Sequence, residues 1–197
     1  MPVGFDTTIL SALLNPNGRL PNDPATGQPV EHAKERIQGL IAKLQKDKQR
    51  IIIPTPVTAE LLTVIGPTNA DYLQIINRSR VFEGRPFDDI AAIELAFLNR
   101  DTFSKLDTTN GLQPWQKVKI DRQILAICRV AQCEVLHTDD KGMIASAERC
   151  GMNTLRISDL PIPDEARQHK FDLEPHEEIP DGEEQDEEDV ENAEAGE

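Results

Sequence analysis

Short β-branched or apolar runs alternate with helical segments along this chain, and that alternation constrains the fold more than any other feature. Strands are predicted at residues 3–5, 51–53, 81–82, 134–138 and 154–157. Helices are predicted, from apolar residues at three- and four-residue steps, at 9–14, 30–44, 59–65, 70–79, 90–98, 120–131 and 144–149. Because strand-helix-strand units make right-handed crossovers, we expect an α/β three-layer sandwich. Its parallel sheet would have four or five strands, with helices on both faces.

Turn-forming and capping residues mark the ends of these elements. Asp88 is expected to cap the helix at 90–98, and Thr55-Pro56 or Thr58 the helix at 59–65. Gly151 is expected to end the helix at 144–149 in a left-handed conformation. Residues 15–29 and 99–117 are predicted to be loops, because Pro, Gly and Asn interrupt any periodic pattern there.

The negative charge is concentrated at the C-terminal end. Residues 172–197 contain 14 of the 35 acidic residues and no Lys or Arg, so residues 1–171 carry 21 acids and 21 bases. We therefore expect a globular domain at residues 1–160 and an acidic, disordered tail at 161–197. The tail is interpreted either as a solubility extension or as a mimic of RNA that covers a phosphate-binding groove.

The composition also limits the compartment. No apolar stretch approaches the roughly 20 residues of a membrane span, and the N-terminus lacks the features of a secretory signal. Cys128, Cys133 and Cys150 form neither an even disulfide set nor a CxxC pair, so reduced, mostly buried thiols are expected and a structural zinc site is not. These features predict a cytoplasmic protein without a membrane anchor.

Four acidic positions share a place in the predicted topology. Asp6 closes the first strand, the pair Asp139-Asp140 closes the strand at 134–138, and Glu60 and Asp121 fall in first turns of helices that could begin on the same side. Ligands of open parallel sheets bind beyond the carboxyl ends of the strands. Clustered carboxylates repel one another unless a cation compensates, and hard oxygen ligands without Cys or His favour Mg²⁺ or Mn²⁺.

Each of these residues also has a purely structural interpretation. Asp6 could cap a helix, Glu60 and Asp121 could face helix dipoles, and Asp139-Asp140 could form a turn. Three further residues are expected to be structural: Glu94 solvated or paired, His137 packed, and Trp115 anchoring a loop. Taken together, the four acids favour the metal cluster over the separate structural roles.

Four segments match a known family in order. Residues 5–10, 56–61, 120–126 and 136–141 resemble the signatures of PIN-domain nucleases, including the VapC-type toxins of bacterial toxin-antitoxin pairs. The resemblance covers about residues 1–160 and implies a PIN-like fold and a metal-dependent endoribonuclease. The family pattern of Thr, any residue, Asp after the fourth strand selects Asp140 as the fourth acid, with Asp139 as the alternative.

The resemblance also implies roles and partners. Asp6 and Asp121 would be the main metal ligands, Glu60 and Asp140 would bind directly or through water, and the hydroxyl of Thr7 or Thr138 would orient them. The expected phosphate-binding residues are Lys117, Lys119, Arg122 and Lys141, with Arg78, Arg80 and Arg85 as second candidates. The implied partners are an RNA substrate, a second copy in a homodimer and, for a toxin, an antitoxin protein.

Several alternatives stand beside this hypothesis. An insertion at about residues 15–50 and the acidic tail depart from the compact toxin pattern, so a longer PIN protein with another role is one alternative. A non-catalytic PIN-like module that binds RNA or protein is another. A phosphatase of the haloacid dehalogenase type needs an Asp where Thr8 stands, and no receiver-domain arrangement of phosphoacceptor Asp and late Lys is evident.

Overall fold

The computed structural model of the chain describes residues 1–167 apart from residues 16, 67–68, 70–71, 73, 75–78 and 101–114. Most of the helix predicted at 70–79, the residue Arg78 and most of the predicted tail lie outside the described residues. In the part of the chain that is described, no helix combines the length and the apolar character needed to cross a membrane.

Five strands form one sheet in which every neighbouring pair is parallel. They are β1 (Val3–Phe5), β2 (Ile51–Pro54), β3 (Phe82–Arg85), β4 (Val135–His137) and β5 (Asn153–Leu155), in the spatial order β3-β2-β1-β4-β5. Val3 of the central strand pairs with Ile51 on one side and Val135 on the other. The predicted parallel α/β sheet is therefore confirmed, and its first strand lies in the middle.

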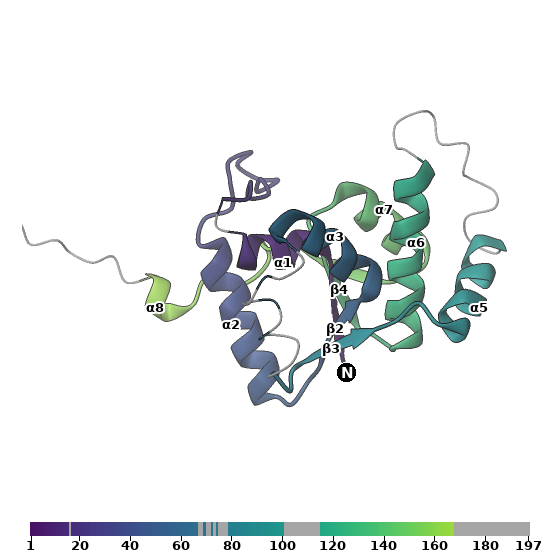
Figure 1. The fold of residues 1–197 in the computed structure, drawn as a ribbon. Coiled ribbons are helices and arrows are strands. Elements are labelled where there is room, and N and C mark those ends of the chain that lie inside the picture. Colours follow the sequence, from purple (N-terminus) through teal and green to yellow (C-terminus); the bar gives the residue numbers. More distant parts are fainter. Residues whose placement is uncertain are drawn as a thin grey trace, which may run out of the picture.

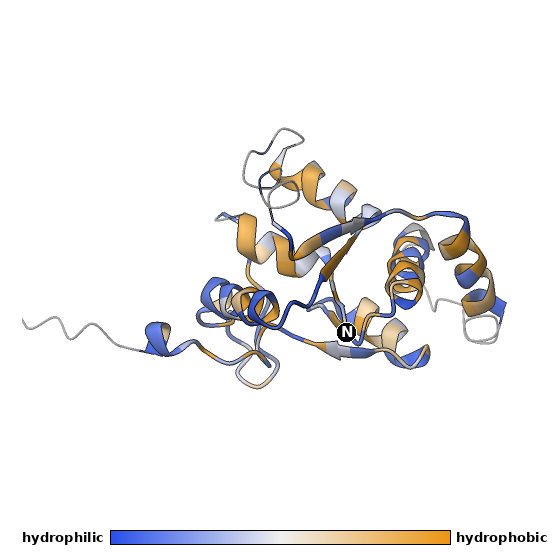
Figure 2. Cartoon of the chain, turned by 90° about the horizontal axis from the view of Figure 1, so that it is seen from below, coloured by the Kyte–Doolittle hydropathy of each residue, from blue (hydrophilic) through white to orange (hydrophobic). Residues whose placement is uncertain are grey.

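Helices cover both faces of the sheet, as expected for right-handed crossovers. The helices α1 (Thr7–Leu14), α2 (Ala33–Lys46) and α3 (Thr55–Ile65) lie on one side, and α5 (Asp89–Leu98), α6 (Trp115–Val130) and α7 (Lys141–Arg149) on the other (Figure 1). A short helix, α8 (Asp164–Arg167), follows β5. The sheet contains both hydrophobic and hydrophilic strand segments, with β2 (Ile51–Pro54) fully buried, whereas α8 is hydrophilic (Figure 2). Because the chain returns from the edge strand β3 to β4, α6 packs against the central part of the sheet.

The core is built around β1 and its two neighbours, β2 and β4. Ile51, Ile52 and Ile53 are at most 2% exposed, as predicted for a strand covered on both faces. His137 is also buried and packs edge-on against Phe5, and burial lowers its pKa to about 4. This confirms the interpretation of His137 as a packed histidine.

The central strand and α6 approach each other closely at a glycine. A Cβ atom at Gly4 would lie 2.8 Å from the Sγ atom of Cys128 on α6. Cys128 and Cys150 are buried free thiols and Cys133 is a half-buried one, as predicted. A side chain at Gly4 would therefore force either the Cys128 side chain or α6 to shift.

Two helices begin earlier than the sequence indicated. α3 begins at Thr55 rather than residue 59, because Pro56 fits the first turn of a helix, where its missing N–H is not needed. Neither Thr55 nor Thr58 caps it: Thr55 accepts a hydrogen bond from the amide of Phe87 instead, and Thr58 one from the hydroxyl of Tyr72. The predicted cap was wrong.

α6 likewise begins at Trp115 rather than at residue 120, so the tryptophan expected in a loop is the first helical residue. Glu60 is therefore the sixth residue of α3 and Asp121 the seventh of α6, one turn further along than expected. At that depth a favourable interaction with the helix dipole no longer explains either acid.

The remaining local predictions agree with the structure. Asp88 caps α5 by accepting from the amide of Ala91 at 2.9 Å, and Gly151 has a φ of +72°. Glu94 forms an ion pair with Arg129. Residues 15–29 contain an isolated bridge between Asn22 and Pro29 but, among the described residues, no helix or strand.

Candidate active site

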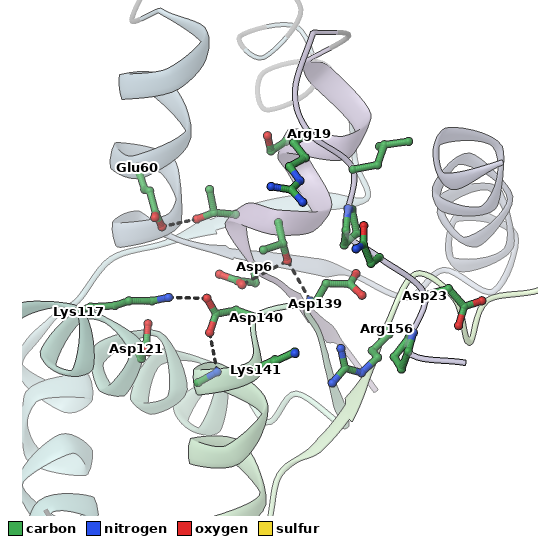
Figure 3. Close-up of a pocket in the computed structure, with 18 of the residues that line it drawn as sticks. Asp6, Arg19, Asp23, Glu60, Lys117, Asp121, Asp139, Asp140, Lys141 and Arg156 are labelled. Atoms are coloured by element: carbon green, nitrogen blue, oxygen red, sulfur yellow. Dashed lines mark hydrogen bonds and ion pairs between the residues drawn. The ribbon is translucent and has the colours of Figure 1, made fainter. Parts of the chain in front are cut away.

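All four predicted acids border one cleft at the carboxyl end of the sheet. Asp6 follows β1, Asp140 follows β4, and Glu60 and Asp121 project from α3 and α6 (Figure 3). The cleft has a volume of about 1270 Å³. The topological argument from the sequence therefore placed these side chains together correctly.

Asp6 occupies the cap position of α1 but does not cap it. Its side chain makes no capping hydrogen bond; Oδ2 accepts from the hydroxyl of Thr138 at 2.7 Å and that of Thr8 at 3.4 Å. Burial raises the pKa of Asp6 to about 6; the hydroxyl of Thr138 and the backbone of Thr7 lower it, while the charges of Glu60 and Asp140 raise it further. The structural interpretation of Asp6 as a helix cap is thus not supported.

Asp121 is a buried carboxylate with an unsatisfied oxygen. Its residue is 6% exposed, and Oδ2 has no hydrogen-bond partner among the described residues. Burial, reinforced by the charge of Asp140, raises the pKa of Asp121 to about 7, although Lys117 opposes the shift. A buried polar oxygen without a partner is costly, and a bound cation would remove that cost.

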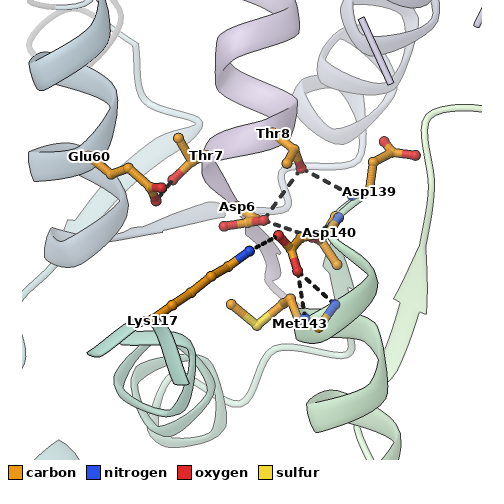
Figure 4. Close-up of polar contacts among 10 residues, drawn as sticks. Asp6, Thr7, Thr8, Glu60, Lys117, Asp139, Asp140 and Met143 are labelled. Carbon is orange, nitrogen blue, oxygen red and sulfur yellow. Dashed lines mark hydrogen bonds and ion pairs between the residues drawn. The ribbon is translucent and has the colours of Figure 1, made fainter. Parts of the chain in front are cut away.

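Asp140 combines a structural and a site role. Its Oδ1 caps α7 by accepting from the amides of Gly142 at 2.7 Å and Met143 at 3.0 Å, while Oδ2 accepts from Nζ of Lys117 at 2.5 Å (Figure 4). Burial opposes its ionisation, but Lys117 and the two amides outweigh burial and lower the pKa of Asp140. Asp140 is therefore the fixed, ionised member of the group.

The two other acids, Glu60 and Asp139, each accept a hydrogen bond from another part of the domain. Glu60 is exposed and its Oε2 accepts from the hydroxyl of Thr7 at 2.6 Å. Asp139 accepts from the amide of Ile157 at 3.1 Å and lies on the β5 side of Asp140 (Figure 4). Asp139 thus ties the loop after β4 to the chain beyond β5, and Asp140 is the better candidate for the fourth acid.

Only two of the four predicted phosphate-binding residues line the acidic cleft. Lys117 and Lys141 border it, whereas Lys119 lines a separate pocket with Arg122 and Leu95. Arg122 is 6% exposed and donates to Oδ1 of Asn99 at 2.9 Å, because this side of α6 faces α5. The expectation that Lys119 and Arg122 flank the acids is therefore wrong. Of the second candidates, Arg85 is paired with Glu83, and both residues belong to β3.

Two arginines that the sequence did not single out line the same cleft. Arg19 lies in the loop between α1 and α2, and Arg156 directly follows β5 (Figure 3). Arg156 could have been found, because it lies at the carboxyl end of the strand predicted at 154–157. Arg19 carried no comparable signal, since its loop has no periodicity.

The residues present suit a hard divalent cation in their chemistry. The donors are carboxylate and hydroxyl oxygens, and the raised pKa values of Asp6 and Asp121 and the unsatisfied Asp121 Oδ2 all point to missing positive charge. As the side chains stand, no group of three or more His, Cys, Asp or Glu among the described residues is arranged to hold an ion. The ammonium of Lys117 contacts Asp140 instead, and its attraction to Asp140, Asp121 and Asp6 raises its pKa although burial alone would lower it.

Comparison with known proteins identifies the fold. No protein-family model and no curated protein sequence matches this chain. A solved structure of VapBC2 from Rickettsia felis, bound to a DNA fragment from its promoter, matches with a TM-score of 0.52 and 15% identity, covering 79% of this chain and 98% of that one. The structure of VapC20 from Mycobacterium tuberculosis, a toxin that cleaves the sarcin-ricin loop, matches with a TM-score of 0.45 and 15% identity, covering 73% and 94%. With its all-parallel five-stranded sheet and helices on both faces, this chain has the PIN-domain fold found in VapC-type toxins.

Proposed function

We propose that this chain is a Mg²⁺- or Mn²⁺-dependent endoribonuclease. The observation that carries the proposal is the pair Asp6 and Asp121, two buried carboxylates at the base of the cleft whose pKa values rise to about 6 and about 7. Two carboxylates in such surroundings destabilise a protein when both are ionised unless a cation binds them, so a function in cation binding would explain their position.

The cleft suits a polymer better than a small metabolite. Its volume of about 1270 Å³ exceeds the range of roughly 300–1000 Å³ that is typical of pockets for small ligands. Lys117, Lys141, Arg19 and Arg156 add positive charge around the acids, which favours a phosphate-bearing substrate. A strand of RNA meets both requirements.

In this proposal the side chains divide the work. Asp6 and Asp121 would hold the cation, and Glu60 and Asp140 would hold it directly or through water. A bound Mg²⁺ or Mn²⁺ would stabilise negative charge on the phosphate and activate water for its hydrolysis. The hydroxyls of Thr138 and Thr7 orient Asp6 and Glu60 through hydrogen bonds of 2.7 and 2.6 Å. Lys117 would move from Asp140 toward the phosphate when the cation enters.

The test is cleavage of end-labelled RNA, both structured and unstructured, with Mg²⁺, with Mn²⁺ and with EDTA. Asp6→Asn should lower the cleavage rate by about a hundredfold or more, because it removes a direct ligand. The matched control is Asp164→Asn, which changes a carboxylate on α8 whose side chain is 93% exposed. The control should cleave like the wild type.

The rival function is a PIN-like module that binds RNA or protein without cleavage. The specific observation in its favour is that Lys117 already pairs with Asp140 at 2.5 Å. Absence of cleavage by the wild type on every RNA tested, with either metal, would favour this rival over the nuclease.

The toxin role and its partners form the finer part of the proposal. The R. felis structure is of a VapBC pair bound to promoter DNA, and it supports including an antitoxin partner in the proposal. A homodimeric state and action on RNA in the cytoplasm are further parts of the proposal. Expression of the wild-type chain should then arrest bacterial growth, while Asp6→Asn should not. Normal growth with wild-type protein that cleaves RNA in vitro would argue against a toxin, and light scattering would test the dimer.

A further inference from the structure

The cleft has a second side, opposite the acids, built from the loop between α1 and α2. Residues 19–24 and Gly27 of this loop line the cleft, and we call residues 19–27 the loop bank. Hydrogen bonds fix it in place: the amide of Val30 bonds to the carbonyl of Pro21 at 3.0 Å, and that of Asp23 to Gln28 at 2.8 Å. Val30 is 3% exposed in the core, so the loop bank is anchored rather than free at its base.

Three cationic side chains face the cleft on or beside this bank. Arg19 comes from the loop bank, Lys141 from the start of α7 and Arg156 from the chain after β5 (Figure 3). No described residue forms an ion pair with Arg19 or Lys141, whereas Arg50 and Arg129 are paired with surface glutamates. Arg156 is half-buried, and its charge lowers the pKa of Asp139, which burial raises. Positive charge is therefore available on this side of the cleft.

The remaining lining of the loop bank is small or polar. It consists of Leu20, Pro21, Asn22, Pro24 and Gly27 together with one acid, Asp23, and no aromatic side chain is found among the described residues that line the cleft. Proteins that bind single strands through their bases use aromatic platforms for stacking. The chemistry of this cleft instead suits the phosphates of a nucleic acid backbone, whose contacts fix the position of a strand without reading its sequence.

We infer that Arg19 and Arg156, assisted by Lys141, bind the phosphates that flank the cleaved bond, so that a single RNA strand lies across the cleft between the acids and the loop bank. This inference rests on the proposed ribonuclease function. It assigns to the insertion after α1 the task of holding the substrate. It also predicts low sequence preference at the flanking nucleotides.

The test is the salt dependence of RNA binding by the full chain in EDTA, where no cleavage interferes. A labelled single-stranded RNA about 12 nucleotides long is titrated by fluorescence anisotropy at several KCl concentrations. Each phosphate contact contributes roughly 0.7 to the slope of log K against log salt for single strands. Arg19→Gln and Arg156→Gln should each reduce the slope by about 0.7, and the double variant by about 1.4.

Two matched variants separate charge from folding. Lys34→Gln removes an exposed cation on α2 that does not line the cleft and should keep the wild-type slope. Arg19→Lys retains the charge and should restore most of the slope lost in Arg19→Gln. In the Mn²⁺-loaded enzyme Arg19→Gln should raise KM with little change in kcat, because flanking contacts bind ground and transition states alike.

The possible results are distinguishable. Unchanged slopes in Arg19→Gln and Arg156→Gln, with RNA still bound, would overturn the inference and leave the nuclease proposal standing. Reduced slopes in a protein that cleaves no RNA would support the loop bank and remove the nuclease. Failure of the wild type to bind single-stranded RNA, or equal dependence of duplex binding on both arginines, would overturn the inference.

Discussion

Replacing Asp6 by asparagine should stabilise the metal-free protein, and the gain should grow as the pH rises. Burial raises the pKa of Asp6 from 3.8 to about 6, so the folded state retains a proton that the unfolded chain releases. The stability of the wild type therefore falls as the pH rises from about 4 to about 6, and the loss persists above that. The Asp6→Asn variant would have no charge to bury at this position.

The pKa shift of Asp6 sets the size of this difference in unfolding free energy. At pH 5 the solution is about one unit below the pKa of Asp6, and one unit corresponds to about 1.4 kcal/mol. The unfolding free energy of Asp6→Asn minus that of the wild type should thus increase by about 1.4 kcal/mol between pH 5 and pH 8. Burial lowers the pKa of His137 to about 4, which has the opposite pH dependence, but it affects both proteins equally and cancels in the difference.

The assay is urea unfolding in EDTA at pH 5, 6, 7 and 8, followed by circular dichroism. Asp164→Asn is the matched control, since its side chain is 93% exposed and its surroundings change little on unfolding. The control should differ from the wild type by a constant amount at every pH. A difference for Asp6→Asn that stays constant or shrinks toward pH 8 would refute the reasoning, because Asp6 would then bear no buried charge.

Three further predictions concern the cation, the lysine and the central strand. Mn²⁺ at a hundredfold excess over its Kd should raise the unfolding free energy of the wild type by about 2.7 kcal/mol and that of Asp6→Asn by far less; equal gains in urea titrations would place the ion elsewhere. Lys117→Met removes the ammonium from Asp140 and should tighten Mn²⁺ binding several-fold in calorimetry, whereas weaker binding would show that the lysine supports the ion. Gly4→Ala should cost about 1–3 kcal/mol in urea unfolding, because the new Cβ would lie 2.8 Å from Cys128 Sγ; no loss would mean that α6 shifts freely.

The fold could be predicted because its central strands are buried on both faces. A β-branched run such as Ile51–Ile53, between two helical patterns, is typical of a strand in a parallel sheet that helices cover on both faces. The same topology placed Asp6 and Asp140 at neighbouring strand ends, since the carboxyl ends of parallel strands meet at one edge. The parallel sheet and the location of the site were therefore predicted by one argument.

Helix geometry explains which cationic residues were placed correctly. Lys117 and Asp121 are four residues apart on α6 and share a side of the helix, whereas Lys119 is two residues from each and points elsewhere. Arg122 is buried because Asn99 at the end of α5 accepts its hydrogen bond, a tertiary contact between residues 23 apart in sequence. The first distinction could be made from spacing alone, while the second required the packing of α5 on α6.

The loop bank could not be predicted from local sequence. Arg19 reaches the cleft because Val30 and Pro21 hold the loop against the domain, not through any repeat in the sequence. The earlier start of α3 moved Glu60 to the sixth residue of the helix, and there the hydroxyl of Thr7 donates to it. Both outcomes depend on contacts between segments that lie apart in the chain.

The central place of β1 has a consequence for synthesis on the ribosome. Val3 pairs with Ile51 on one side and Val135 on the other, so the first strand made must wait for one of the later strands before the middle of the sheet closes. Asp6 cannot meet Asp121 and Asp140 until that late segment has left the exit tunnel. A nascent chain thus has no assembled acidic site until the segment that carries Asp121 and Asp140 has been synthesised.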